Sequence, residues 1–215
     1  MPAGAINKNM QGLVIKSTGS RYLVRSGGNT YDCVLKGKLR LEGRKTTNPI
    51  AVGDQVDFEI ETNGEASIKN IHPRRNYIIR KSINLSKQAQ ILASNLDQAV
   101  LIATLVSPRT SLGFIDRFLI TAEAYGIPAK IIFNKSDLLD EEQKKIQKEI
   151  MDLYSGIGYS CYDVSSYNKE EVEQLKSVFK DQMTLIAGHS GVGKSTFINA
   201  LEQGLNLKTG EISSA

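Results

Sequence analysis

The segment "MTLIAGHSGVGKSTFINAL", residues 183–201, joins a short apolar run to a glycine-rich loop and then to a predicted helix. From Gly188 to Ser195 it satisfies the pattern Gly-x-x-x-x-Gly-Lys-Ser, directly after the predicted strand and at the start of the helix. Backbone N–H groups of such a loop, together with the helix N-terminus, form a positive cradle for phosphate groups. The segment therefore predicts a nucleoside-triphosphate site in an α/β domain.

Within this loop the residue types have different expected roles. The glycines allow the backbone to approach the phosphates closely, and Lys194 is expected to contact the β- and γ-phosphates. The hydroxyl of Ser195 is the expected Mg²⁺ ligand, and we assign catalytic roles to Lys194 and Ser195. The phosphate-binding candidates are Gly188, His189, Ser190, Gly191, Val192, Gly193, Lys194, Ser195 and Thr196. The alternative is a glycine-rich turn with a solvated lysine.

A second motif, "NKSD", ends the apolar run at residues 131–133 and indicates which base is bound. The carboxylate of Asp137 can accept hydrogen bonds from N1–H and the N2 amine of guanine, whereas adenine offers neither donor there. Lys135 can lay its aliphatic stem over the ring, and Asn134 can tie this loop to the phosphate loop. The guanine-binding candidates are Asn134, Lys135, Ser136 and Asp137. The alternative is a helix cap at Ser136 or Asp137.

A third candidate wall of the site follows the predicted strand "YSCYDV". There Ser165 and Ser166 are placed so that a backbone N–H could meet the guanine O6, although serines after a strand are also common turn residues. The three motifs each follow a buried strand, so they open on one edge of a sheet whatever their order along the chain. A base-reading loop that precedes the phosphate loop therefore indicates a circularly permuted GTPase domain.

The chain has two predicted domains and a connector between them. Residues 1–73 contain short β segments, such as the alternation of Val56, Phe58 and Ile60 with acidic residues, which favour a small closed barrel. Residues 74–96 read as a basic connector, and residues 97–215 alternate buried strands with helices. The predicted fold class is an N-terminal all-β OB-type barrel followed by an α/β P-loop GTPase domain with a doubly wound, mostly parallel sheet.

Charge separates the two halves of the chain and indicates a partner. Residues 1–90 hold 15 Lys and Arg against 7 Asp and Glu, whereas residues 91–215 hold 12 against 16. A basic small barrel fits a nucleic-acid partner, with tyrosines as stacking surfaces at Tyr22, Tyr31 and Tyr77. The RNA-binding candidates are Lys36, Lys38, Arg40, Arg44, Lys45, Arg74, Arg75, Arg80 and Lys81. The alternative is a solvated basic face with the tyrosines in the core.

Composition excludes several other classes of protein. With 40% hydrophobic and 23% charged residues the chain reads as globular, and its longest apolar stretch is too short to span a bilayer. The first residues lack the apolar centre of a secretion signal, so we expect a cytoplasmic protein without a membrane partner. Cys33 and Cys161 have no neighbouring ligand-type residues in a metal spacing, and we interpret both as buried hydrophobes.

The barrel, "NKSD", "VSS", "GHSGVGKST" and "TGEIS" together resemble the bacterial small-ribosomal-subunit-dependent GTPase A (RsgA) family over essentially the whole chain. The resemblance implies GTP and GDP binding with Mg²⁺, and slow GTP hydrolysis that the small ribosomal subunit accelerates. It also implies a monomer that acts late in maturation of that subunit and contacts its rRNA. His189 stands where the family often has Gln, which we treat as neutral for phosphate binding.

The resemblance also implies parts that this sequence does not contain. After "TGEISSA" the family continues into its switches and a helical domain with a Cys/His zinc site, so we expect little hydrolysis from residues 1–215 alone. One alternative function is an RNA module that binds GTP or guanosine polyphosphates with negligible turnover. A metabolite kinase is disfavoured because it would leave "NKSD" unexplained.

Overall fold

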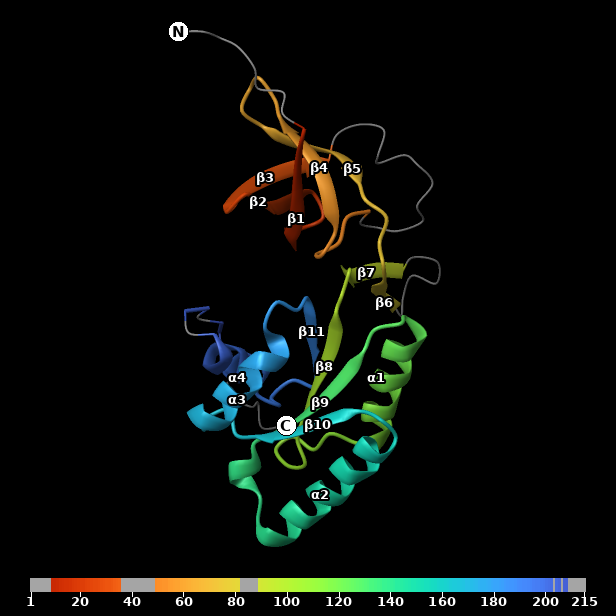
Figure 1. Cartoon of the computed structure of the whole chain (residues 1–215), viewed down its shortest axis with the longest axis vertical. Helices are drawn as coiled ribbons and strands as arrows, with labels where there is room; N and C mark the ends of the chain where they lie inside the picture. The colour runs from red at the N-terminus through yellow and green to blue at the C-terminus, as the bar shows by residue number, and fades with distance from the viewer. Residues whose placement is uncertain (1–8, 36–48, 82–88, 203, 206, 209–215) are drawn as a thin grey trace. The chain divides into compact units, whose positions relative to one another are not determined.

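The computed structural model describes residues 9–35, 49–81, 89–202, 204–205 and 207–208. The chain divides into two compact units, Met1–Leu96 and Asp97–Ala215, and each is described by itself. No helix in the described part of the chain is long and apolar enough to cross a membrane. Figure 1 labels the strands and helices that follow.

Five strands of the first unit form a closed barrel in the order β1-β2-β3-β5-β4. Their bounds are β1 Met10–Ser17, β2 Arg21–Ser26, β3 Asn29–Leu35, β4 Gln55–Ile60 and β5 Ala66–Ile71. In β4 the side chains of Val56 and Phe58 are fully buried while Gln55 is exposed, which is the alternation expected from the sequence. β3 pairs with β5 in parallel, and β1 closes against β4 in antiparallel register. The predicted OB-type barrel is confirmed.

The barrel interior corrects one prediction about the tyrosines. Tyr22 is only 1% exposed and packs inside the barrel with Val14 and Phe58, because side chains must fill the interior of a small barrel. Tyr22 is therefore unable to stack on a base. Tyr31 packs partly against the same core, with its ring centroid 5.1 Å from that of Phe58, whereas Tyr77 is 42% exposed.

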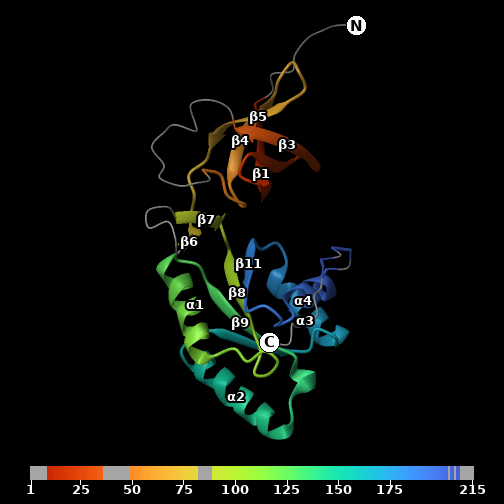
Figure 2. The same cartoon turned by 180° about the vertical axis from the view of Figure 1, so that it is seen from behind.

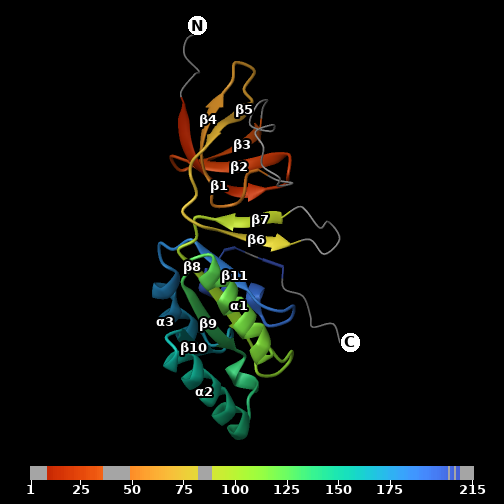
Figure 3. The ribbon, with the colours of Figure 1, turned by 90° about the vertical axis from the view of Figure 1, so that its right-hand side faces the viewer.

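Residues 77–81 and 89–94 form the two strands of a β-hairpin where the sequence suggested only a connector. Strands β6 Tyr77–Lys81 and β7 Ala89–Ser94 pair in antiparallel fashion, as Figure 3 shows. Ile78 and Ile91 are 6% and 8% exposed, so each strand buries an apolar side chain. Burial of these side chains stabilises the pairing of the two strands, which belong to the first unit.

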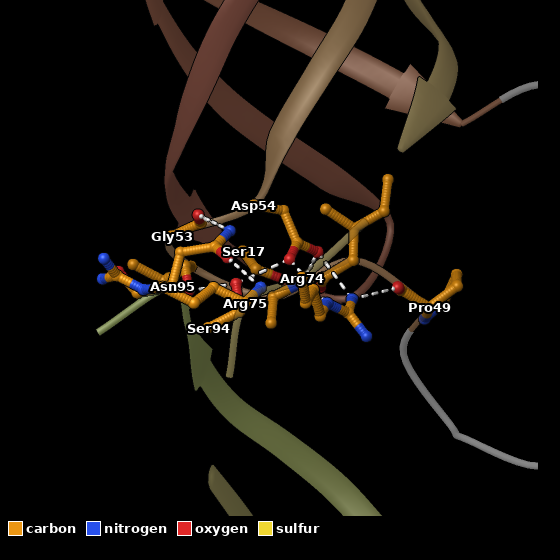
Figure 4. Close-up of polar contacts among 11 residues, drawn as sticks. Ser17, Pro49, Gly53, Asp54, Arg74, Arg75, Ser94 and Asn95 are labelled. Atoms are coloured by element: carbon orange, nitrogen blue, oxygen red, sulfur yellow. Dashed lines mark hydrogen bonds and ion pairs between the residues drawn. The ribbon is translucent and has the colours of Figure 1, made fainter. Parts of the chain in front are cut away.

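The buried carboxylate of Asp54 connects the barrel to this hairpin (Figure 4). It accepts hydrogen bonds from Arg74 Nε at 2.7 Å and Nη2 at 2.6 Å, and from Ser94 Oγ at 2.6 Å. Gly53 is required beside it, since a Cβ there would lie 2.0 Å from the Ser94 carbonyl oxygen. Arg74 also donates to the Pro49 carbonyl oxygen at 2.8 Å, and its side chain is 11% exposed.

This network changes the reading of Arg74, which the sequence suggested as an RNA contact. Its guanidinium instead neutralises a buried carboxylate inside the first unit, because a buried charge needs a paired and hydrogen-bonded partner. The neighbouring Arg75 donates from Nη2 to the carbonyl oxygens of Asn95 and Leu96, at 3.2 and 2.9 Å. Both arginines therefore have structural roles.

The second unit is built on a parallel sheet with strand order β10-β9-β8-β11. Its elements are β8 Gln98–Ala103, α1 Leu112–Ala124, β9 Ala129–Asn134, the 3₁₀ turn η2 Ser136–Leu138, α2 Glu141–Gly156, β10 Ser160–Val164, α3 Lys169–Phe179, β11 Thr184–Ala187 and α4 Lys194–Leu201. All six residues of β8 are buried, as the continuous apolar run predicts.

Helices cover both faces of this sheet. In Figures 1 and 2, α1 and α2 lie on one face and α3 and α4 on the other. Ile115 and Leu119 of α1 pack with Tyr154 of α2 in one core cluster, whereas Val172 of α3 and Phe197 of α4 belong to another. The predicted doubly wound α/β architecture is confirmed.

Strand order fixes where a ligand fits. The chain proceeds from β8 to β9 and β10 and then returns to the other side of β8 with β11, so the order reverses between β8 and β11. In open parallel sheets, ligands bind beyond the carboxyl ends of the strands at such a reversal. The loops that follow β8 and β11 flank this point, and the glycine-rich loop is one of them.

Candidate functional site

The phosphate-loop candidate runs from the end of β11 to the first turn of α4. In the described part of the chain, no protein acceptor takes the backbone N–H groups of residues 190–196. Ser195 and Thr196 lie in the first turn of α4, with Ser195 directly after Lys194. Unpaired N–H groups at a helix N-terminus create a positive potential that suits phosphate oxygens. The loop therefore has the donor set that a polyphosphate requires.

Close backbone packing explains why this loop needs glycine. Gly193 has φ +90°, and a Cβ on it would lie 2.5 Å from Asn134 Nδ2. Gly188 packs equally closely on β8, where a Cβ would lie 2.4 Å from the Ile102 carbonyl oxygen. A side chain at either position would push the loop away from the strands that hold it.

Lys194 is held by the carbonyl groups of the loop. Its Nζ donates to the Gly188 oxygen at 2.9 Å and to the His189 oxygen at 2.6 Å. An ammonium group has three donors, so one more remains for a phosphate oxygen. Partial burial lowers the pKa of Lys194 below its usual value, because desolvation disfavours the charged form.

Asn134, at the end of β9, connects all three sequence motifs. Its Nδ2 donates to the Val192 carbonyl oxygen of the glycine-rich loop at 2.9 Å. Its Oδ1 accepts from the Ser166 backbone N–H at 3.0 Å and from the Ser166 hydroxyl at 2.8 Å. Asn134 is 2% exposed and Ser166 is 8% exposed, so these bonds are shielded from water. The three loops therefore form one continuous site.

The rest of the "NKSD" loop does not cap α2. Asp140 is the N-cap residue of that helix and forms a capping box with Gln143, which excludes the capping alternative for Asp137. Asp137 is exposed in the 3₁₀ turn, and no described residue donates a hydrogen bond to its carboxylate. Lys135 has φ +67° and donates from Nζ to the Ser107 carbonyl oxygen. Burial is the main cause that lowers the pKa of Lys135.

The loop after β10 differs in detail from the sequence expectation. The N–H of Ser165 donates to Glu171 Oε2 at 2.7 Å, and that of Ser166 donates to Asn134, so protein acceptors take both. The N–H of Tyr167 makes a longer contact of 3.3 Å with the rotatable Ser165 hydroxyl. Tyr167 is therefore a better donor candidate for the guanine O6. The sequence does not indicate this role, because the pattern predicts where the strand ends but not which acceptor each N–H group finds.

A contact between two aromatic rings beside the phosphate loop was not predicted, although His189 itself was among the candidates. The His189 ring lies 3.9 Å from the Phe114 ring, measured between centroids, with the ring planes 33° apart. Phe114 lies in the first turn of α1, far from His189 in sequence. No local pattern predicts such a pair, because it depends on the order of the strands in the sheet.

The RNA-binding candidates lie in the first unit, and most are not described at the side-chain level. Lys36, Lys38, Arg40, Arg44 and Lys45 fall outside the described residues. Arg80 and Lys81 belong to strand β6, and their side chains also lie outside the description.

The two free cysteines are Cys33, which is buried, and Cys161, which is partly buried. Burial is the main cause that raises the pKa of both thiols, to about 12 for Cys33.

An open parallel sheet, a glycine-rich phosphate loop and an Asn-Lys-Ser-Asp loop that precedes it in the chain define a circularly permuted P-loop GTPase domain, here preceded by a barrel. Residues 71–215 match the RsgA GTPase family, and residues 11–68 match the RsgA N-terminal domain. The chain belongs to the RsgA GTPase family.

Named relatives and solved structures agree with this assignment. The chain is 51% identical over 205 residues to the small ribosomal subunit biogenesis GTPase RsgA of Bacteroides fragilis (strain YCH46), covering 95% of this chain and 66% of that protein. It is 51% identical over 208 residues to the protein of the same name from Flavobacterium johnsoniae, covering 95% and 64%. The chain therefore spans slightly less than two thirds of these relatives.

Two solved structures match this chain in fold. YjeQ from Thermotoga maritima matches with a TM-score of 0.78 and 32% identity, over 94% of this chain and 68% of that one. YloQ, described as a circularly permuted GTPase, matches with a TM-score of 0.70 and 28% identity, over 93% and 66%. The order of the loops in this chain agrees with the description of YloQ as circularly permuted.

Proposed function

We propose that this chain binds GTP and GDP together with Mg²⁺ at the carboxyl edge of the parallel sheet. The observation that carries the proposal is the bonding of Asn134, which links the loop with the guanine-type carboxylate to the phosphate loop through Val192 and to the third loop through Ser166. A base and a phosphate chain can then contact one rigid site at once. Such a site favours guanine, because Asp137 is an acceptor for the N1–H and N2 amine.

The residues present fit the proposed ligand. The unpaired N–H groups of residues 190–196 and the third donor of Lys194 suit the phosphate oxygens. Ser195 would hold Mg²⁺, which neutralises charge on the β- and γ-phosphates when bound. The N–H of Tyr167 and the aliphatic stem of Lys135 complete the surroundings of the base.

We further propose that the protein hydrolyses GTP to GDP and phosphate during late maturation of the small ribosomal subunit. The names of the relatives from B. fragilis and F. johnsoniae support this proposal. We further propose a cytoplasmic monomer that contacts rRNA through the basic side of its barrel. The zinc site implied by the family resemblance is assigned to the part of the family's length that this sequence does not cover.

Calorimetry with the chain as it stands tests nucleotide binding. The parent should bind GDP and GTP, Lys194→Ala should abolish measurable binding, and Ser195→Ala should chiefly weaken the Mg²⁺-dependent part. A Lys194→Ala variant that binds like the parent would reduce the glycine-rich loop to a turn.

Turnover of the full-length protein, with and without purified small subunits, separates a GTPase from a binding module. Faster GTP turnover in the presence of small subunits supports a GTPase. Negligible turnover under both conditions supports a module that only binds the nucleotide.

Binding to small subunits across a salt series tests the RNA partner. Each phosphate contact releases counterions, so affinity should fall steeply as salt rises. Charge reversal at Arg44 and Lys45 should flatten that slope while leaving guanine-nucleotide affinity unchanged. Binding that is insensitive to salt, or complete after both reversals, would show that this basic segment is not the RNA contact.

A further inference from the structure

The glycine-rich loop has few side chains that can hold it in place. Gly188, Gly191 and Gly193 all have positive φ, and Ser190 is exposed. Glycine-rich backbone has a large conformational entropy to lose on ordering, so a loop of this composition needs external anchors. Its anchors determine how well its N–H groups and Lys194 are preorganised for phosphate.

Val192 is the first anchor of the loop. It is fully buried and packs with Val100 and Ile102 of β8, in the cluster that also contains residues of α3 and α4. Its carbonyl oxygen accepts the hydrogen bond from Asn134. Val192 thus fixes the loop on the α3/α4 face of the sheet, close to the start of α4.

His189 is the second anchor, on the other face of the sheet. Its ring packs on Phe114 of α1, with 3.9 Å between the ring centroids, and Phe114 itself packs against the α1/α2 core cluster. The carbonyl oxygen of His189 accepts the 2.6 Å hydrogen bond from Lys194 Nζ. A connected path therefore runs from the core through Phe114 and His189 to the ammonium group of Lys194.

We infer that Phe114 is a positioning residue of the phosphate loop, which acts through the ring of His189 on Lys194. The inference deepens the proposed nucleotide site and rests on it. It also gives an indirect role to the ring of His189, which the sequence suggested is neutral for phosphate binding. The segment that leads into α1 contacts the other lysine of the site as well, since the Ser107 carbonyl oxygen accepts from Lys135 Nζ. The loop after β8 and the first turn of α1 thus position both ammonium groups, at the point where the strand order reverses.

A double-mutant cycle on GDP affinity tests the inference. Phe114→Leu and His189→Ala should each weaken GDP binding about three- to tenfold, the range expected for loss of one aromatic pair. The double variant should bind GDP no more weakly than the single variant with the lower affinity, because both changes remove the same interaction. Phe114→Tyr keeps the ring and should bind like the parent. The ratio of the affinities for GDP and xanthosine diphosphate should stay constant, because these variants leave the "NKSD" loop unchanged.

Phe118 offers a matched control on the same helix. It packs against the same core cluster one turn farther along α1, so Phe118→Leu makes the same chemical change away from the loop. This control should lower thermal stability as much as Phe114→Leu does while leaving GDP affinity within about twofold of the parent. Equal losses of affinity in the two variants would show that Phe114 acts only by stabilising the core.

Proton NMR gives a readout that is independent of affinity. The chain has 2 histidines, so the ring resonances of His189 are identified by comparison with His189→Ala. In the parent they should carry a ring-current shift from Phe114, which Phe114→Leu removes and Phe114→Tyr restores. An unshifted His189 resonance, or independent effects of the two single variants, would overturn the inference while GDP binding by the parent upholds the nucleotide site. A parent that binds no guanine nucleotide would overturn both.

Discussion

The side-chain amide of Asn134 donates a 2.9 Å hydrogen bond to the backbone carbonyl oxygen of Val192, 58 residues farther along the chain. Asn134 ends β9, and Val192 lies in the loop that follows β11, so the bond spans the strand β8 that separates them in the sheet. The hydrogen bond joins the proposed base-reading loop to the proposed phosphate-reading loop, and it does not depend on which of the two loops comes first in the chain. Chain order can therefore change while the site stays whole.

We expect Asn134→Ala to weaken GDP binding and to lower stability together. The substitution leaves the Val192 carbonyl oxygen and the Ser166 N–H without partners at a buried position, which costs about 1–3 kcal/mol for each unsatisfied group. Calorimetry with GDP and chemical unfolding measure the two effects. Ser166→Ala is the matched control: it removes only the 2.8 Å hydroxyl bond, so its loss should be about 1 kcal/mol. Equal effects of the two variants would contradict this assignment.

Asp137→Asn should change the preferred base from guanine to xanthine. An amide in place of the carboxylate can donate to the C2 oxygen of xanthine, whereas it meets the N2 amine of guanine with a second donor. We expect GTP affinity to fall by about 2 kcal/mol or more and affinity for xanthosine triphosphate to rise. Competition binding with both nucleotides measures the change. Unchanged GTP affinity would remove Asp137 from the base-reading role.

Gly193→Ala should abolish nucleotide binding with little change in secondary structure. The added Cβ would lie 2.5 Å from Asn134 Nδ2 and would occupy a backbone conformation with φ +90°. Gly156→Ala is the control, because a Cβ at that position in α2 meets nothing within 4 Å. GDP titration of both variants measures binding, and circular dichroism measures their secondary structure. Together they distinguish loss of the phosphate-binding loop geometry from general unfolding. Retained binding by Gly193→Ala would show that the loop relaxes at small cost.

The sequence was sufficient for those parts of the molecule that have a local pattern. The alternation at Val56 and Phe58 predicted a strand of the barrel, and the Gly-Lys-Ser pattern predicted the loop between β11 and α4, because backbone geometry sets both periodicities and loop composition. The pairing of β6 with β7 was not predicted, since its register depends on contacts between two short segments and not on a local pattern.

Contacts between residues that are far apart in the sequence could not be predicted from local patterns. Arg74 read as a surface charge in the sequence, yet its carboxylate partner Asp54 lies 20 residues away and is fully buried. Tyr22 was a candidate stacking surface with a core position as the alternative, and only closure of the barrel decides between them. The contact between Phe114 and His189 likewise depends on strand order and not on spacing along the chain.

The first unit should lose one stabilising contribution in acid. A hydrogen bond from His72, and then one from Asn70, lowers the pKa of the Asp57 carboxyl. Because the folded pKa lies below the unfolded value of about 3.9, the ionised carboxylate contributes stability above that value, and the contribution disappears as pH falls through the folded pKa. Asp57→Asn should therefore be less stable than the parent at neutral pH and equally stable in strong acid. A difference that stays constant with pH, measured by urea unfolding, would rule out the linkage.

The ion pair of Asp54 and Arg74 should matter more for folding than for binding. Arg74→Met leaves a fully buried carboxylate without its cation, and loss of one partner of a buried pair costs about 3–5 kcal/mol. Because the chain has no tryptophan, urea unfolding is best followed by circular dichroism and tyrosine fluorescence. The double variant Arg74→Met with Asp54→Asn should recover part of the loss, since the amide still offers an oxygen to the Ala51 N–H and carries no charge.

The same variant distinguishes the structural role of Arg74 from contact with RNA. GDP affinity serves as the control for the second unit and should remain that of the parent. Binding to small subunits should weaken only where the first unit unfolds, so the double variant should bind better than Arg74→Met at the same salt concentration. An Arg74→Met protein of parental stability whose affinity for small subunits falls and loses part of its salt dependence would contradict this view, because Arg74 would then be a phosphate contact.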